Sequence, residues 1–294
     1  MSRVVFVLTP QVHLLDLAGP AQVFSTAPGY TLHYVGESAS VPTWQGVALH
    51  ADLEWPELNR DDLVVVPGWR SGFGYFRAGT LEKISAHHGA GGTVASVCAG
   101  ADALGRAGLL DGRRCTTHHD LQDVLARTFP RATVVRDVLY VSDDRVVTSA
   151  GIASGIDLAL HLVALRHGPA VAAQVAREMV VYARRNGDER QASAMLRHRA
   201  HLSDVVHRVQ DRIDASFAEP LPLADLATAA GVSERTLTRL FTAATGRTPL
   251  RYQQTLRVER AAYLIGHGST VDAAARAVGF TDARMLRKLR ARVT

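Results

Sequence analysis

Cys98 is the side chain in this sequence that is best placed for covalent chemistry. It stands in the segment TVASVCAGADAL, where an apolar run typical of a buried strand meets small residues typical of a helix start. A turn from strand to helix presents its side chain at the carboxyl edge of a parallel sheet, as a nucleophile elbow does. Because the N-terminus of the following helix can lower a thiol pKa, we expect the pKa of Cys98 to lie below its usual value of about 8.5. A small buried core residue is the alternative interpretation of a lone cysteine at this position.

Six polar side chains near the C-terminus are suited to nucleic acid recognition. They lie at i, i+3 and i+4 in two stretches whose leucines face the other way, so each stretch predicts a helix with one apolar and one cationic face. Arginine on such a helix can bind guanine bidentately in the major groove of DNA. One basic helix face is more often a solvated surface than a DNA-binding one, whereas two copies in register favour DNA. The six residues are Arg235, Thr238 and Arg239 in the first stretch and Arg284, Arg287 and Lys288 in the second.

These two stretches belong to a sequence repeat. The segment PLADLATAAGVSERTLTRL, which begins at Pro222, aligns with TVDAAARAVGFTDARMLRKL, which begins at Thr270. Each copy predicts a short helix, a tight turn with a glycine in the left-handed region, and a second helix capped by a hydroxyl group. The repeat therefore predicts two helix-turn-helix units. The turn glycines are Gly231 and Gly279, and the predicted caps are Ser233 and Thr281.

The elements that position these residues differ between the two parts of the chain. In the first part, runs of valine and leucine alternate with helical segments of about ten residues, which predicts βαβ units on a parallel sheet. The runs are continuously apolar, as expected for strands buried on both faces. We therefore predict an α/β, flavodoxin-like parallel sheet domain followed by an all-α domain with two helix-turn-helix units. The predicted bounds are 1–182 for the α/β domain, 183–201 for a polar, basic linker and 202–294 for the helical domain.

Charge separates the same two parts. Residues 197–294 hold 16 Arg and Lys against 9 Asp and Glu, a net charge of +7, whereas residues 1–196 hold 17 against 19, a net charge of −2. A basic third on a near-neutral body predicts a polyanionic partner for that third. The composition is that of a globular protein rather than a disordered or membrane-spanning chain, and the two cysteines form no Cys/His cluster. We expect a cytoplasmic protein with no membrane partner, metal or cofactor.

Residues from about 207 to 294 resemble the AraC/XylS family of bacterial transcription regulators. The resemblance rests on GVSERTLTRLF, TGRTPLRY and LRVERAAYLI, which match that family's first unit and the helix that connects it to the second. It implies double-stranded promoter DNA as the partner and one long helix, here residues 249–265, that holds two recognition helices about one DNA turn apart. Members of that family continue past the second recognition helix with another Gly-x-Ser/Thr-Pro segment. Because this sequence ends at Thr294, we expect a truncated second unit.

Residues 3 to about 180 resemble the PfpI/ThiJ branch of the class I glutamine amidotransferase-like superfamily. The matching segments are LLDLAGPAQVF, VVVPG, SVCAGADALGRAGLLDGRRCTTHH and VVTSAGIASGIDLALHLV. The resemblance implies that the elbow cysteine faces an acid from the first strand–helix loop, here Asp16, and a histidine 20 residues further on, here His118. It also implies a backbone N–H group at Gly68 near the same pocket, although Trp69 replaces the glycine that commonly follows.

Together the two resemblances cover nearly the whole chain and correspond to the GlxA-like architecture of transcription regulators. They imply a DNA-binding regulator rather than an enzyme, with an α/β domain that forms a homodimer and senses a small-molecule effector. Two alternatives remain open at Cys98. One is a cysteine-dependent hydratase or amidase-like activity that uses Asp16 and His118, and the other is a redox sensor that acts through thiol oxidation. The duplicated helix-turn-helix favours the regulator, because an enzyme does not need it.

Overall fold

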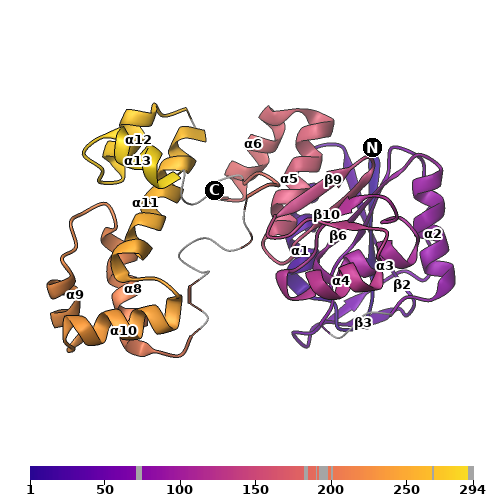
Figure 1. The fold of residues 1–294 in the computed structure, drawn as a ribbon. Helices are drawn as coiled ribbons and strands as arrows, with labels where there is room; N and C mark the ends of the chain where they lie inside the picture. The colour runs from indigo at the N-terminus through magenta and orange to yellow at the C-terminus, as the bar shows by residue number, and fades with distance from the viewer. Residues whose placement is uncertain are drawn as a thin grey trace. The chain divides into compact units, whose positions relative to one another are not determined.

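The chain divides into two compact domains, Met1–Gln191 and Ala192–Thr294 (Figure 1). The computed structural model describes residues 1–70, 75–181, 185–189, 191, 198–199, 201–266 and 268–290. In these residues the first domain combines strands and helices, and the second contains helices alone. The predicted linker, residues 183–201, lies partly outside the described residues.

Six strands form the central sheet of the α/β domain: β1 (Ser2–Leu8), β2 (Tyr30–Gly36), β5 (Leu63–Val66), β6 (Thr93–Val97), β9 (Tyr140–Asp143) and β10 (Val146–Ser149). Their order is β2-β1-β5-β6-β10-β9. All neighbours run parallel except β9, which pairs antiparallel with β10. The parallel strands follow the doubly wound order of flavodoxin-like folds, so the predicted α/β class is confirmed.

Helices cover both faces of this sheet, which is why its strands are apolar without alternation. The even-numbered residues of β1 from Val4 onward pack with α1 (Leu14–Thr26), α5 (Ser154–His167) and α6 (Pro169–Glu178). The odd-numbered residues from Val5 onward pack on the other side with three further helices. These are α2 (Ala78–Gly89), α3 (Ala101–Arg106) and α4 (Gln122–Thr128). Two small sheets flank this body: β3 (Ser40–Pro42) with β4 (Ala48–His50), and β7 (Arg114–Cys115) with β8 (Thr133–Val134).

Six described helices build the second domain: α8 (Asp204–Ser216), α9 (Leu223–Ala230), α10 (Glu234–Thr245), α11 (Pro249–Gly266), α12 (Val271–Ala277) and α13 (Ala283–Arg290). The first helix-turn-helix unit, α9 and α10, shares an apolar core with α8 and with Tyr252 and Leu256 of α11. The second unit, α12 and α13, shares a separate core with Val258 and Ala261 of α11. Helix α11 therefore belongs to both cores (Figure 1). Among the described helices of the chain, none has the length and apolar character needed to cross a membrane.

The turns of both units follow the predicted glycine geometry, but one predicted cap is wrong. Gly231 and Gly279 have φ angles of 69° and 83°, in the left-handed region. The Ser233 hydroxyl accepts a backbone N–H of α10 at 3.2 Å, as predicted. In the second unit the cap is Asp282 rather than Thr281, because the Asp282 carboxylate accepts two backbone N–H groups of α13 at 2.8 and 3.2 Å. Aspartate is as good a cap as threonine, so α13 begins one residue later than expected.

A short segment beyond α6 packs against the α/β domain beside β9. The Leu139 N–H group donates to the Gly187 carbonyl at 2.8 Å. The Arg185 guanidinium binds the carboxylate of Asp157, which is 3% exposed, through Nε at 3.1 Å and Nη2 at 2.5 Å. Gln191 donates its side-chain amide to two backbone carbonyls, both at 3.0 Å. The described residues of this segment, 185–189 and 191, are thus held on the α/β domain, of which they form part.

Candidate functional site

Cys98 directly follows β6, at the carboxyl edge of the sheet. Its φ angle is 55°, a left-handed conformation that turns the chain sharply into the 3₁₀ turn Cys98–Gly100. Non-glycine residues seldom adopt this conformation, and such strained positions collect at functional sites. The sharp strand-to-helix turn predicted at Cys98 is therefore present.

Three glycines make room for this turn. A Cβ atom on Gly68 would lie 2.7 Å from the Cβ atom of Cys98, and one on Gly151 would lie 2.3 Å from it. A Cβ atom on Gly100 would lie 2.1 Å from the carbonyl oxygen of Val66. These distances are too short for real atoms, so the local chain path requires glycine at all three positions. Gly68 follows β5 and Gly151 follows β10, so the strands on either side of β6 bring backbone against Cys98.

The carboxyl group of Asp16 reaches the same place from α1. Asp16 is fully buried, and its Oδ1 atom accepts the N–H group of Ile152 at 2.6 Å. The carboxyl group also interacts with the backbone N–H of Gly68 and with the thiol of Cys98. The resemblance implied Asp16, Gly68 and Cys98, and the structure brings these three together. It adds Gly151 and Ile152, which the sequence reasoning missed. Gly151 and Ile152 could have been predicted from the glycine-containing loop directly after β10, because loops that follow neighbouring parallel strands lie at the same edge of the sheet.

Burial controls the protonation of Asp16 and Cys98. It raises the pKa of Asp16 from 3.8 to about 6, and the hydrogen bonds to the carboxylate offset this only in part. It also raises the pKa of the Cys98 thiol, and the negative charge of Asp16 raises it further. The expected low pKa of Cys98 is therefore wrong, because the N–H group of Ala99 stabilises the thiolate less than burial and Asp16 disfavour it. At neutral pH Cys98 keeps its proton and Asp16 is the anionic member of the pair.

His118 lies in a turn whose preceding residue contacts the elbow. Its Nδ1 atom accepts the backbone N–H of Asp120 at 3.4 Å, and its ring centre is 4.1 Å from that of His119. In the described part of the chain, its hydrogen-bonding and charged partners do not include Cys98. Thr117 does touch the elbow, since its hydroxyl donates to the Cys98 carbonyl at 2.7 Å. Asp16 and Gly68 therefore lie against Cys98, whereas His118 lies in the adjacent turn, where its Nδ1 atom accepts a hydrogen bond from Asp120.

Three residues of this turn are of types that bind metals. One ligand atom each from His118, His119 and Asp120 lies within 4.8 Å of the others. The side chains of His119 and Asp120 are 63% and 75% exposed, and contacts between imidazole and carboxylate groups in an exposed turn are ordinary without an ion. From the sequence we expect no metal, and we assign none to this turn.

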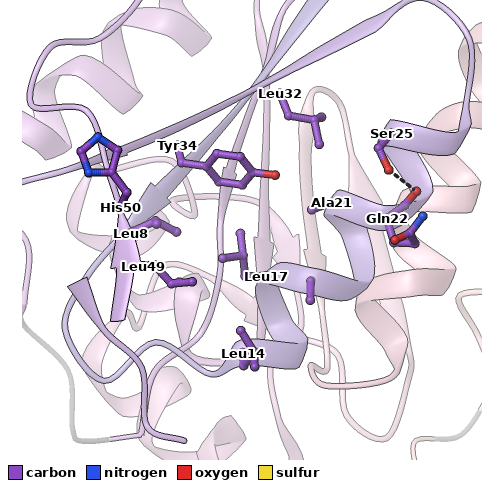
Figure 2. A pocket seen from close by; sticks show the side chains of 11 residues that line it. Leu8, Leu14, Leu17, Ala21, Gln22, Ser25, Leu32, Tyr34, Leu49 and His50 are labelled. Carbon is purple, nitrogen blue, oxygen red and sulfur yellow. Dashed lines mark hydrogen bonds between the residues drawn. The ribbon is translucent and has the colours of Figure 1, made fainter. Parts of the chain in front are cut away.

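A hollow of about 410 Å³ opens elsewhere on the α/β domain, beside α1, β2 and β4 (Figure 2). Its wall is mainly apolar, with leucine the commonest residue, and the Tyr34 hydroxyl and a few other polar groups lie among the apolar side chains. Neither Asp16 nor Cys98 is among the described residues that line it, so the hollow and the elbow are separate places. The lining residues are Leu8, Leu14, Leu17, Ala18, Ala21, Gln22, Ser25, Leu32, Tyr34, Leu49 and His50.

The two helices predicted to recognise DNA each have a buried apolar face and an exposed basic face. In α10, Leu237 is buried while Arg235 and Arg239 are exposed, and Thr238 is half-buried. In α13, Leu286 is fully buried. The remaining predicted contact residues are exposed on α13, namely Arg284, Arg287 and Lys288. The cationic side chains of both helices are therefore available to a partner.

Comparison with known proteins assigns both domains. A model of the DJ-1/PfpI family matches residues 2–165, which is more than half of the chain. The chain belongs to the DJ-1/PfpI family. A helix-turn-helix domain model matches residues 226–294, a range that includes α10 to α13. The resemblances of the two parts of the sequence are thereby confirmed.

Curated relatives include both regulators and an enzyme. The HTH-type transcriptional regulator GbdR of Pseudomonas aeruginosa is 32% identical over 208 residues, 69% of this chain and 55% of its own length. The HTH-type transcriptional regulator CdhR of the same species is 30% identical over 226 residues, 75% of this chain and 65% of its own length. Isonitrile hydratase of Pseudomonas putida is 36% identical over 163 residues, 53% of this chain and 68% of its own length. The chain therefore spans 55% to 65% of the length of these two regulators.

Solved structures share the fold. The crystal structure of an AraC family transcriptional regulator from Pseudomonas putida superposes with a TM-score of 0.54 at 22% identity, over 61% of this chain and 100% of that one. A ThiJ/PfpI family protein from Pseudomonas syringae gives a TM-score of 0.54 at 20% identity, over 73% of this chain and 86% of that one. At these identities the likeness concerns the fold.

Replacing Asp16 with asparagine should remove a pH dependence from the stability of the α/β domain. Burial raises the pKa of Asp16 to about 6 in the folded chain, so the folded chain holds more protons than the unfolded chain between pH 3.8 and 6. The free energy of unfolding therefore falls as the pH rises through this window. Asp16→Asn should raise the free energy of unfolding at pH 8 by on the order of 1–3 kcal/mol and change it little near pH 4.

Urea unfolding followed by tryptophan fluorescence measures this effect, because all three tryptophans, Trp44, Trp55 and Trp69, lie in the α/β domain. Asp61→Asn is the matched control, since Asp61 is an exposed aspartate of the same domain, and it should follow the wild type. If wild type and Asp16→Asn show the same pH dependence, the raised pKa of Asp16 is wrong.

Proposed function

We propose that this chain is a sequence-specific DNA-binding transcription regulator whose α/β domain senses a small molecule. The observation that carries the proposal is the pair of exposed basic faces on α10 and α13, each backed by its own apolar core and joined through α11. Similarity to the regulators GbdR and CdhR supports it. Promoter DNA of a bacterial cell lies in the cytoplasm, so we place the protein there.

Duplex DNA is the partner that fits these faces. Helix α11 has 18 residues and at about 1.5 Å per residue is about 27 Å long. Two recognition helices packed toward its two ends have a separation comparable to one turn of DNA, about 34 Å, so both can enter the major groove on one side of the duplex. Arg235 and Arg239 of α10 then reach guanine edges or phosphates, and Thr238 lies between them. Arg284, Arg287 and Lys288 do the same on α13.

In this proposal the sensing site is the elbow around Asp16 and Cys98. Open α/β sheets bind ligands at the carboxyl ends of their strands, which is where these two side chains lie. The Asp16 pKa of about 6 means that a bound group of either charge can change the protonation of this carboxyl near neutral pH. Cys98 is 7% exposed and protonated at neutral pH, which makes thiol oxidation slow and disfavours the redox sensor.

An enzyme is the second candidate, because the α/β domain is similar to isonitrile hydratase and Asp16 touches the Cys98 thiol. In such a reaction Asp16 takes the thiol proton and passes it to the terminal carbon of the isonitrile as the sulfur adds to that carbon, which gives a thioimidate. Water then adds across the carbon–nitrogen double bond, with one proton going to nitrogen and the hydroxyl group to carbon. The carbon–sulfur bond breaks as the hydroxyl proton returns to the sulfur of Cys98, which releases an N-substituted formamide. This scheme assigns no step to His118, whose Nδ1 atom accepts the backbone N–H of Asp120 in its own turn.

Arg239→Ala should weaken binding to the preferred duplex by about 1–3 kcal/mol and relax the sequence preference at one position. The duplex is enriched from a random library by the wild-type chain, and binding is measured by fluorescence anisotropy at fixed salt, because phosphate contacts make the affinity fall as salt rises. Arg177→Ala removes an exposed arginine of the α/β domain and should bind as the wild type does. Unchanged affinity and sequence preference in Arg239→Ala would show that Arg239 does not read a base.

We also propose that the α/β domain forms a homodimer, because two linked copies on repeated DNA sites multiply a modest affinity. Light scattering of the full chain at tens of micromolar should report about twice the 31.7 kDa mass of one chain. A mass of one chain at that concentration would contradict the dimer.

The Cys98→Ser variant separates the regulator from the enzyme. In the regulator this variant should bind DNA as the wild type does, because the residues proposed to contact DNA belong to the other domain. In the enzyme it should reduce formamide production from an alkyl isonitrile by several orders of magnitude, as loss of a nucleophile does. Cys115→Ser, which removes the other buried thiol, is the control. Wild-type turnover above about 1 s⁻¹ that is lost in Cys98→Ser alone would overturn the assignment as a regulator without catalysis.

A further inference from the structure

Arg257 of α11 is hydrogen-bonded to backbone carbonyl groups of two separate segments. Its Nε atom donates to the Phe217 carbonyl at 2.6 Å, and its Nη2 atom donates to the Glu219 carbonyl at 2.9 Å. Its Nη1 atom donates to the Gly279 carbonyl at 3.0 Å. Phe217 and Glu219 lie in the loop between α8 and α9, and Gly279 is the turn glycine of the second helix-turn-helix unit. One guanidinium group therefore links the first core to the second unit.

The ends of two helices meet at this guanidinium group. Phe217 caps the C-terminus of α8, and Gly279 follows the C-terminal cap of α12. The last carbonyl groups of a helix have no partner within the helix and carry partial negative charge, so a cation stabilises them. Arginine supplies five donors in a fixed plane and can bind three carbonyls at once, whereas the compact ammonium group of lysine cannot span them.

The two segments are also in direct contact. Gly279 has a φ angle of 83°, and a Cβ atom there would lie 1.8 Å from the Ala218 carbonyl oxygen. Phe217 packs against both apolar cores, and the Arg257 guanidinium lies 5.6 Å from the ring centre of Phe280. The boundary between the two units is therefore closely packed around Arg257.

Gln253, one helical turn before Arg257, secures the loop between α8 and α9 independently. Its side-chain amide, on a residue that is 5% exposed, donates to the Phe217 and Glu219 carbonyls at 2.9 and 2.8 Å. When Arg257 is replaced, these two carbonyls keep Gln253 as a donor, while the Gly279 carbonyl loses its bond to α11. A change at Arg257 therefore acts on the placement of the second unit more than on the fold of the first.

We propose that Arg257 is a positioning residue that fixes α13 relative to α10, so that the two recognition helices bind DNA at one set spacing. The DNA part of this inference rests on the proposed function, whereas the fixed relation of the two helices can be tested without DNA. Arg257 itself is half-buried between the two units, so its replacement alters the spacing without removing a side chain of α10 or α13.

The first experiment measures the distance between the two helices in the full chain. Spin labels are attached through Thr242→Cys on α10 and Met285→Cys on α13, both exposed positions, in a chain that also carries Cys98→Ser and Cys115→Ser. Double electron–electron resonance should give one narrow distance distribution with Arg257 and a distribution at least about twice as wide with Arg257→Gln. Arg260→Gln is the matched control, because Arg260 is an exposed arginine of the same helix, and it should keep the narrow distribution.

Arg257→Lys is a second variant that keeps the test valid if Arg257→Gln fails to fold. It keeps a positive charge between the two helix ends, so it should fold even if the glutamine variant does not, and it should still widen the distribution because it cannot bind three carbonyls. Circular dichroism and thermal unfolding report whether each variant is folded. Equal distribution widths for the wild type and for every folded Arg257 variant would overturn the proposal.

The second experiment tests the spacing on DNA, with the duplex enriched by the wild-type chain. Footprinting locates the two protected segments, and about five base pairs, half a helical turn, are inserted between them. The wild type and Arg260→Gln should bind the lengthened duplex at least about tenfold more weakly than the original, a difference of about 1.4 kcal/mol. Arg257→Gln should bind the original more weakly than the wild type does and should lose less than about threefold on insertion.

The outcomes separate this inference from the proposed function. A wild-type chain that enriches no duplex contradicts DNA binding, and the spin-label distances then decide on Arg257 alone. A wild-type chain that binds DNA but tolerates the insertion contradicts the set spacing. An Arg257→Gln chain that keeps the full insertion penalty shows that Arg257 does not position the second unit.

Discussion

Glycine at positions 68, 100 and 151 allows the backbone to pass close to Cys98. The sharp turn at Cys98 could not form with a larger residue at any of these positions. Because the segments after β5 and β10 approach Cys98 with no Cβ atom at Gly68 or Gly151, the Asp16 carboxyl group is enclosed by backbone and by the thiol. This burial raises the pKa values of both Asp16 and Cys98. The packing that assembles the pair thus also keeps the proton on sulfur, and any chemistry at Cys98 begins with the transfer of that proton.

In the helical domain the corresponding constraint is that carbonyl groups at helix ends lack partners within the helix and need other hydrogen-bond donors. The two helix-turn-helix units have separate cores, which share α11 and the side chain of Phe217. Hydrogen bonds from Arg257 to the Phe217 carbonyl and to the Gly279 carbonyl, in the turn after α12, add directional contacts between the units. Apolar burial and directional polar contacts therefore act together at this boundary.

Much of the fold could be predicted from the sequence, and the reasons lie in particular residues. Continuous apolar runs such as 63–66 identified strands buried on both faces, and the repeat with Gly231 and Gly279 identified two helix-turn-helix units. Helix α6 was missed because its apolar residues are small alanines and valines, although Pro169 after Gly168 is a start signal. The antiparallel direction of β9 follows from the two-residue turn between β9 and β10, because parallel neighbours need a much longer connection.

The residues of the candidate site could be predicted from the sequence, but the direction of the pKa shift at Cys98 could not. The family resemblance placed Asp16, Gly68 and Cys98 together; Gly68 and Cys98 follow strands at one edge of the sheet, and Asp16 lies in the first turn of α1 rather than in the loop before it. The sign of the pKa shift at Cys98 could not be predicted, since it depends on how deeply the folded chain buries the thiol and on how near Asp16 lies to it. A helix start favours a thiolate, but at this elbow burial and the carboxylate of Asp16 disfavour the thiolate more.

The short segment beside β9 has a consequence for how two copies of this chain can associate. Strand β9 ends the sheet on one side, and its outer edge would offer free N–H groups to a strand of another molecule. The Gly187 carbonyl accepts the N–H groups of Leu139 and Tyr140 at 2.8 and 3.2 Å, which covers the start of that edge. On the opposite side, Asp52 exchanges hydrogen bonds with Tyr34 and Gly36 of β2 at 2.8 and 2.9 Å, which covers the end of the other edge. Each edge is thus capped in part from within the chain, which disfavours growth of the sheet from molecule to molecule through these residues.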